Sequence, residues 1–225
     1  TGNPTIVLGA SFIGAIIMTH SDDKGLVLPP RIAERKVVVI PIPGKKADPD
    51  TVFAEAEKLA GDLGMQRHVH VDARPNVSPG WKFHHWEQHG VPVRIELGPR
   101  DIEQGQAVVV RRDTGEKQPV ARAELARVVT DTLESIQSGL FERALAMQRD
   151  HTFRVDDQDA FRGKLDDPGG FLLAHWCGDP DCEERIQNET KATIRCIPLD
   201  APEEQGACPF CNRPSQRRVV FAKAY

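Results

Sequence analysis

The sequence is marked first by what it lacks. Cysteine is absent from the first 176 residues, and all five cysteines lie from residue 177 onwards. Residues 1–10 contain no basic leader, and together with an odd cysteine count this argues against a secreted disulfide scaffold. The most apolar early run, Phe12–Met18, is far shorter than the about 20 residues of a membrane helix. No membrane span is therefore expected.

The chain also has no excess of positive charge. It contains 29 Lys and Arg residues against 33 Asp and Glu residues, with a net charge of −4 and an isoelectric point of about 6.1. A protein that binds nucleic acid by general charge attraction is usually basic, so any such role must rest on local sites. With 40% hydrophobic and 28% charged residues among 225, the composition predicts a globular protein of one or two domains.

The sequence divides into three parts. Residues 1–30 form a short lead, with an apolar helix or strand at Ser11–Thr19 and a double proline at Pro29-Pro30 that is typical of a linker. Residues 31–150 alternate between strand and helix patterns. Residues 151–225 form a second, smaller domain that contains all the cysteines.

The middle part predicts an α/β fold. Lys36–Ile42 is a continuous β-branched run, as in a buried strand, and Asp48-Pro49 begins a helix that Gly64 ends. The later elements are, in order, a strand over Gln66–Asp72, a helix from Ser78 to Gly90, a strand over Val91–Leu97, a hairpin of Gln106–Arg111 and Glu116–Ala121, and a long amphipathic helix from Leu125 to Met147. This order predicts a mixed sheet with helices on its faces.

The last part predicts a small α+β domain with cysteines at its turns. Helices are expected over Asp157–Leu165 and Asp181–Thr190, with strands over Gly170–Trp176 and Ala192–Ile197 and a closing strand or tail over Arg217–Tyr225.

Four of the cysteines have the spacing of a metal site. The pairs are Cys177-x4-Cys182 and Cys208-x2-Cys211, and zinc takes four such ligands in a tetrahedron. Four protein ligands leave no open position, so the role would be structural. Cys196 stands alone in Thr193–Ile197, and we expect it to be a buried apolar residue. The alternative is a set of reduced thiols with no metal.

A second cluster crowds aromatic, histidine and charged residues into residues 79–101. One interpretation is a platform for single-stranded RNA, on which aromatic rings stack on bases while Arg and Glu side chains bond to base edges. The other is that Trp81, Phe83 and Trp86 anchor the core and the charges form a solvated face. The pattern alone favours the second interpretation. His85 and His89 lack a third ligand, so they are expected to be packing or surface residues.

Three segments resemble prolyl-tRNA synthetases. Residues 14–31 (GAIIMTHSDDKGLVLPPR) are similar to the end of the catalytic domain in that family, and residues 79–117 (PGWKFHHWEQHGVPVRIELGPRDIEQGQAVVVRRDTGEK) to its anticodon-binding domain. The cysteine pattern, with Ala192–Cys196 and the terminal Val219–Tyr225, resembles the C-terminal zinc domain of the archaeal/eukaryotic-type form, which some bacteria also have.

The resemblance implies a fold and a function. It implies a class II synthetase anticodon-binding domain over residues 31–150, a zinc-binding domain over residues 151–225, and a remnant of the catalytic domain in residues 1–30. The family uses ATP to activate proline, attaches it to the tRNA for proline, and works as a cytoplasmic homodimer. Its anticodon-binding domain reads two guanines. The residues that recognise these guanines, here called the readers, map to Glu87, Arg94 and Arg100, with Lys82 and Glu96 as outer candidates. The zinc ligands map to Cys177, Cys182, Cys208 and Cys211.

Two departures from the family pattern restrict the expected activity. Most of the catalytic domain, with its proline pocket and its dimer and ATP motifs, would lie upstream of Thr1. Family members also carry Ser-x-Arg just before the Phe-Ile-Gly of residues 12–14, and here Gly9 and Ser11 hold those positions. We therefore expect no catalytic residue in this chain, and binding and specificity rather than catalysis. The alternative is a stand-alone RNA-binding or regulatory protein derived from a synthetase.

Overall fold

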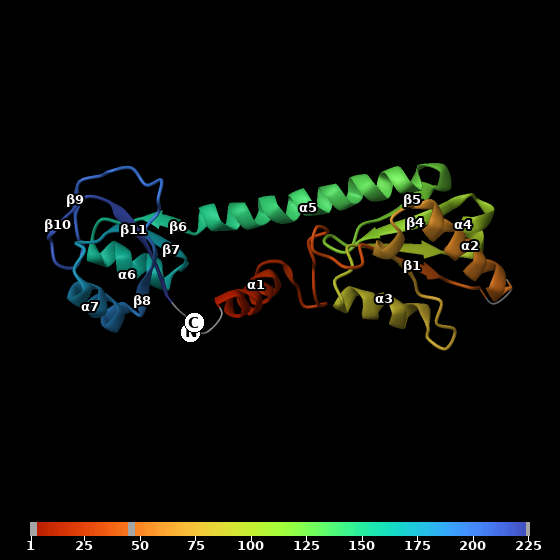
Figure 1. Cartoon of the computed structure of the whole chain (residues 1–225), viewed down its shortest axis with the longest axis horizontal. Helices are drawn as coiled ribbons and strands as arrows, with labels where there is room; N and C mark the ends of the chain where they lie inside the picture. The colour runs from red at the N-terminus through yellow and green to blue at the C-terminus, as the bar shows by residue number, and fades with distance from the viewer. Residues whose placement is uncertain (1–3, 45–47, 224–225) are drawn as a thin grey trace. The chain divides into compact units, whose positions relative to one another are not determined.

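The computed structural model describes residues 4–44 and 48–223, without the side chains of residues 4–11. The chain forms two compact units, Thr1–Ala144 and Leu145–Tyr225. The boundary between them falls within one long helix (Figure 1). The predicted domain limits at 30/31 and 150/151 stay predictions. The side chain of Ser11, at the position of the family's motif arginine, lies outside the described residues.

The first unit is built on a five-stranded mixed sheet, as the sequence predicted. Its order is β2-β1-β3-β4-β5, in which β1 pairs in parallel with β2 and β3, and β4 pairs antiparallel with β3 and β5. The strands are β1 (Val37–Pro41), β2 (Val69–Val71), β3 (Val93–Leu97), β4 (Gln106–Arg111) and β5 (Lys117–Ala121). The expected strand over Gln66–Asp72 is shorter than predicted, because Gln66–His68 forms a 3-10 turn, η1.

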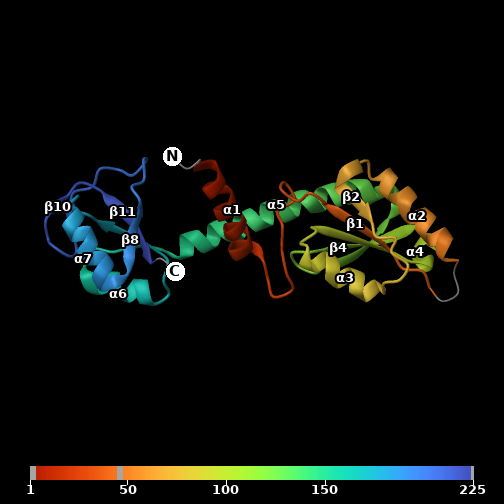
Figure 2. The ribbon, with the colours of Figure 1, turned by 60° about the horizontal axis from the view of Figure 1, so that its bottom comes forward.

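Helices cover both faces of this sheet. Apolar side chains of α2 (Pro49–Asp62) and α5 (Leu125–Asp150) pack with Val39 and Ile95 on one face, and α3 (Pro79–Gln88) lies on the other (Figures 1 and 2). The central strand β1 is buried on both sides, since Val37–Ile40 are fully inaccessible. The β-branched run in the sequence predicted this position.

Local sequence signals begin and end these helices. Asp48 caps α2 by accepting a hydrogen bond from the Asp50 N–H, and Ser78 caps α3 by accepting one from Trp81. Past the end of α3, Gly90 has a φ of +69°, and a Cβ there would lie 2.7 Å from the Leu26 Cβ. Only glycine fits this close approach.

The lead segment packs on the first unit. The Leu26 N–H donates to the Gln88 carbonyl at 3.2 Å, and Val27 belongs to the main core. The buried Arg112 guanidinium forms a two-pronged pair with Asp22 at 2.8 and 2.7 Å and donates to the Glu87 carbonyl. These contacts fix the C-terminal end of α3. Further upstream, the expected helix or strand at Ser11–Thr19 is the helix α1 (Pro4–His20).

The second unit is a small α+β fold, as predicted. Its four-stranded sheet has the order β6-β7-β11-β8, and α6 (Gln158–Asp166) and α7 (Pro180–Thr190) pack against it. The strands are β6 (Thr152–Arg154), β7 (Phe171–His175), β8 (Ala192–Cys196) and β11 (Arg218–Lys223), with a small separate hairpin of β9 (Gly206–Ala207) and β10 (Pro214–Ser215). The Phe161 ring makes edge contacts with Phe210 and Phe221 at the centre of this core.

Sequence patterns missed the shortest elements. These are β6, the β9–β10 hairpin, and the helix α4 (Pro99–Glu103), which begins where the Asp101 carboxylate accepts a hydrogen bond from the Gly98 N–H at 2.9 Å. Strands of two or three residues and a helix of little more than one turn carry too little periodicity to be recognised on their own. In the described part of the chain, no helix combines the length and apolar composition that a membrane span requires.

A buried carboxylate links β2 to α3. Asp72 is 1% exposed and follows β2 directly. Its oxygens accept hydrogen bonds from Arg74 Nε and Nη2 at 2.8 and 2.6 Å and from Trp86 Nε1 at 2.8 Å. The Lys82 ammonium donates to the Asp72 carbonyl at 2.8 Å. Burial raises the pKa of Asp72, but the bonds from Arg74 and Trp86 outweigh it and hold that pKa well below its ordinary value.

Replacing this carboxylate should destabilise the first unit. Asp72→Asn leaves the buried Lys82 without a negative partner, so we expect a loss of about 3 kcal/mol in the free energy of unfolding. Urea unfolding followed by circular dichroism measures it. The exposed pair Arg31–Glu134 supplies the control, since Glu134→Gln should change the free energy by less than about 1 kcal/mol.

Acid should remove the stabilisation that the Asp72 carboxylate provides. Because the folded pKa of Asp72 is lowered, its stabilisation is complete above the unfolded value of about 3.9 and is lost as the pH falls below it. The stability difference between wild type and Asp72→Asn should therefore shrink below about pH 4. A difference that stays constant down to pH 2 would contradict the assignment.

Candidate nucleic-acid interface and metal centre

Three of the predicted readers meet in one cluster. The Arg94 guanidinium lies between two carboxylates, with Nη1 at 3.1 Å from Glu87 Oε1 and Nη2 at 3.0 Å from Glu96 Oε1. Lys117 joins from β5, with Nζ at 2.9 Å from Glu96 Oε1. We call Glu87, Arg94, Glu96 and Lys117 the charged cluster.

The fold explains why these side chains meet. Arg94 and Glu96 are two residues apart on β3, so they share the sheet face that α3 covers, while Ile95 points into the main core. Phe83 and Glu87 are four residues apart on α3 and lie one above the other. The Arg94 guanidinium lies 4.4 Å from the centroid of the Phe83 ring. The aromatic ring and the two carboxylates therefore fix the arginine from three sides.

The cluster leaves acceptors at its rim. The Arg94 side chain is 10% exposed and its N–H groups are directed at protein carboxylates, whereas the Glu87 side chain is 25% exposed. Oε1 of Glu87 is bound by Arg94, and among the described residues Oε2 pairs only with the exposed His84, at 3.8 Å. A fixed carboxylate of this kind can accept hydrogen bonds from the Watson–Crick edge of guanine, where N1–H and the N2 amino group are donors.

The other two predicted readers lie elsewhere. Arg100 is exposed on α4, just beyond the carboxyl end of β3, and has no ion pair among the residues that the structure describes. Lys82 is buried, with its ammonium directed at Asp72 rather than at the charged cluster. Sequence reasoning did not single out Asp72 or Lys117, because their contacts with Lys82, Trp86 and Glu96 join different elements of the fold.

The three aromatic residues of α3 divide between the two interpretations. Trp86 is 5% exposed and anchors the core, as the pattern favoured. Phe83 is half-buried beneath Arg94. Trp81 is 48% exposed, and its ring stacks on that of His85 with centroids 4.8 Å apart. Only Trp81 therefore presents a large aromatic surface to solvent.

Four cysteines of the second unit come together. Cys177, Cys182, Cys208 and Cys211 place their sulfur atoms within 4.8 Å of one another, and Cys182 Sγ lies 3.8 Å from Cys208 Sγ. That separation is too long for a disulfide, and it matches the about 3.8 Å between ligands of a tetrahedron with bonds of about 2.3 Å. The donor set and its spacing fit a tetrahedral metal ion such as zinc.

Local structure positions the four thiols. Cys177 follows β7 and Cys182 lies in the first turn of α7, which Asp179 caps. Cys208 and Cys211 lie in one tight turn, closed by a hydrogen bond from the Asn212 N–H to the Cys208 carbonyl at 2.8 Å. Burial raises the pKa of the Cys177 and Cys182 thiols, so metal binding would have to displace their protons.

The prediction for Cys196 was wrong. It is exposed rather than buried, and it is not part of the four-cysteine group. Cys196 ends β8, which is an edge strand, and burial along that strand decreases from Ala192 through Ile194 to Cys196. The residue therefore lies beyond the end of the core.

No other metal-binding arrangement occurs in the described residues. The four cysteines are the only group of three or more candidate ligands found there. The His85 and His89 rings contact each other in a tilted arrangement at 42°, with centroids 4.2 Å apart.

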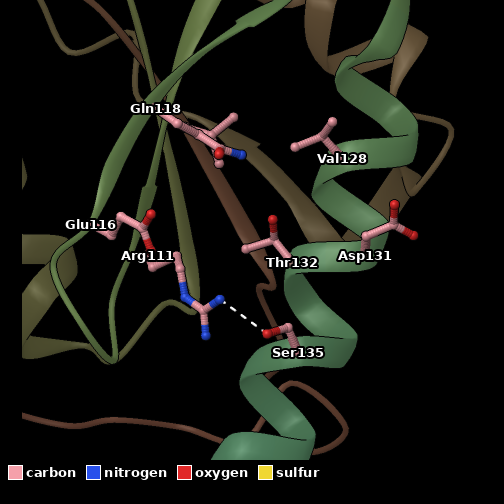
Figure 3. Close-up of a pocket in the computed structure, with 8 residues that line it drawn as sticks. Arg111, Glu116, Gln118, Val128, Asp131, Thr132 and Ser135 are labelled. Atoms are coloured by element: carbon pink, nitrogen blue, oxygen red, sulfur yellow. Dashed lines mark hydrogen bonds between the residues drawn. The ribbon is translucent and has the colours of Figure 1, made fainter.

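A further cavity of about 310 Å³ lies on the opposite face of the sheet, between β4, β5 and α5 (Figure 3). Arg111 faces Ser135 across it and donates to the Ser135 hydroxyl at 3.1 Å. The same guanidinium is paired with Asp113, and the cavity is also lined by the carboxylates of Glu116 and Asp131. Without a free positive charge, it is poorly suited to a phosphate.

Comparisons with known families match both units. The family described as "Anticodon binding domain" matches residues 36–132, and "Prolyl-tRNA synthetase, C-terminal" matches residues 158–225. The first match contains the charged cluster, and the second contains all four clustered cysteines.

Curated relatives are similar in sequence to almost the whole of this chain. Proline--tRNA ligase 2 of Clostridioides difficile (strain 630) is 45% identical over 220 residues, which is 96% of this chain and 45% of the relative. Proline--tRNA ligases of Flavobacterium johnsoniae and Mycobacterium leprae (strain Br4923) are 47% and 46% identical, over 95% and 97% of this chain and 44% and 46% of their own lengths. The chain thus spans a little under half the length of these relatives.

Proposed function

We propose that this chain, which carries the anticodon-binding domain and the C-terminal domain of the prolyl-tRNA synthetase family, binds the tRNA for proline by its anticodon. The observation that supports this most strongly is the charged cluster. It lies within the matched anticodon-binding domain and presents a fixed carboxylate at the surface.

Each predicted reader receives a role from its position. Glu87 accepts hydrogen bonds from an anticodon guanine, and Arg94 holds Glu87 and Glu96 in place as a positioning residue. The exposed Arg100 contacts a phosphate or the acceptor edge of the second guanine. The buried Lys82 supports α3 from beneath rather than touching RNA.

The wider activity is proposed from the family. The parent protein would attach proline to its tRNA with ATP, in the cytoplasm and as a homodimer formed through its catalytic domain. We assign no catalytic residue to this chain, which contributes tRNA recognition. The proposed domains are a catalytic-domain remnant at residues 1–30, the anticodon-binding domain at 31–150 and the zinc-binding domain at 151–225.

Glu87→Gln tests the reading of guanine. An amide oxygen replaces one acceptor, and an NH₂ group faces the guanine donors. We expect wild type to prefer proline tRNA over a transcript with both anticodon guanines changed to adenine by about tenfold or more. We expect the variant to prefer proline tRNA by less than about threefold. Filter binding at a stated salt concentration measures both affinities.

A control variant distinguishes the loss of a negative charge from the loss of a hydrogen bond to guanine. Glu124→Gln removes one negative charge from the exposed face of the 3-10 turn before α5, where Glu124 pairs with Arg127. Glu124→Gln should bind both transcripts slightly and equally more tightly, because a repulsive charge is lost, whereas Glu87→Gln should bind proline tRNA more weakly. Only Glu87→Gln should lose the preference for guanine, and a full preference in that variant would refute the role of Glu87.

We propose that the four cysteines hold one structural zinc ion. Cys177, Cys182, Cys208 and Cys211 would supply four thiolates, which leaves no coordination position for a substrate. When bound, the ion cross-links β7, α7 and the turn at residues 208–211, and its binding energy stabilises the second unit.

A pair of serine substitutions tests the metal. Cys182→Ser should lower bound zinc from one equivalent to near zero and destabilise the second unit, whereas Cys196→Ser should keep one equivalent, because Cys196 is outside the group. Elemental analysis measures the stoichiometry. Cobalt added to the metal-free wild type should give the absorption of a four-thiolate site. One equivalent of zinc in Cys182→Ser would contradict the assignment.

A further inference from the structure

The opposite flank of α3 carries a hollow that the charged cluster does not use. It has a volume of about 480 Å³ and is lined mainly by Arg35, His70, Arg74, His85 and Trp86. Successive helix residues are about 100° apart, so Trp81 and His85 lie on the side of α3 away from Phe83 and Glu87. The hollow is therefore a different surface from the one that holds Arg94.

A row of rings on α3 lies beside the hollow. The Trp81 and His85 rings are nearly parallel, at 15°, and His85 also contacts His89. Burial, and next the neighbouring His89, lower the pKa of His85. An exposed indole stacked on an imidazole is a planar surface of the kind on which bases stack.

The hollow also holds two arginines with unused donors. Asp72 binds Nε and Nη2 of Arg74, which holds the guanidinium 4.8 Å from the Trp81 ring centroid. Arg74 Nη1 has no hydrogen-bond partner within the described part of the chain. Arg35 lies over the Trp86 ring at 5.3 Å and has no ion pair in the same residues. Asp72, the only acid in the lining, is already bound to Arg74 and Trp86.

We infer that this hollow binds one unpaired nucleotide of the same RNA, outside the two guanines read at the charged cluster. Its base stacks on the ring row of Trp81 and His85, and its phosphate contacts Arg35 and Arg74. A nucleotide is the ligand that combines a planar ring with an adjacent negative charge. The inference rests on the proposed function, because it places the same RNA across both flanks of α3.

Substitutions at exposed positions test the nucleotide subsite. Trp81→Ala should weaken binding about fivefold or more, equally for proline tRNA and for the transcript whose anticodon guanines are changed to adenine. Trp81→Phe, which keeps an aromatic face, should restore most of the affinity. Arg35→Gln should weaken both about equally and reduce the slope of log affinity against log salt by about one.

Matched controls lie on α5. Phe141 is 62% exposed and controls for the loss of a surface aromatic residue, and Arg127→Gln controls for the loss of a surface charge. Thermal unfolding should show that all variants fold. The subsite would be overturned if Trp81→Ala bound RNA as tightly as Phe141→Ala, and Arg35→Gln as tightly as Arg127→Gln.

The two proposals fail in different ways. If wild type prefers guanine while Trp81→Ala and Arg35→Gln match their controls, only the subsite is overturned. If wild type shows no preference but these variants still lose affinity for both transcripts, anticodon reading is overturned and the subsite is supported. No measurable binding of either transcript by wild type overturns both.

Discussion

The fixed position of the Arg94 guanidinium is the interaction on which the candidate site depends. Arg94 is 8% exposed and lies on β3, the middle strand of the sheet, where an unpaired charge would cost several kcal/mol. Glu87 and Glu96 offset that cost, and Phe83 covers the guanidinium. Holding the arginine therefore holds the carboxylates as well, and Glu87 is presented to solvent in a defined orientation before any RNA binds. Such preorganisation lowers the entropy cost of recognition.

Helix α3 carries both of the surfaces that we propose bind RNA. Its inner face is attached to the sheet by Trp86 and Lys82, which meet Asp72 at the end of β2. One flank then carries Glu87 over the charged cluster, and the other carries Trp81 and His85 over the arginine-lined hollow. In a chain with a net charge of −4, the RNA binding that we propose rests on these local contacts rather than on general charge attraction.

Sequence patterns predicted the elements better than the contacts between them. The β-branched run gave the buried strand β1, and the caps Asp48 and Ser78 gave the starts of two helices, because these signals are local. Cysteine spacing likewise predicted the four-thiol group. The contacts of Asp72 with Trp86 and of Lys117 with Glu96 join separate elements, which periodicity does not report. Cys196 was mispredicted because a lone cysteine is usually buried, whereas here its strand continues past the core.

The central claim is that a fixed carboxylate recognises the donors of guanine. The most direct measurement is the affinity of the wild-type chain for proline tRNA in which each anticodon guanine is replaced in turn by inosine, which lacks only the N2 amino group. We predict that inosine at one of the two positions weakens binding by about tenfold, as expected for the loss of a hydrogen bond to a charged acceptor. Unchanged affinity with inosine at both positions would contradict the account.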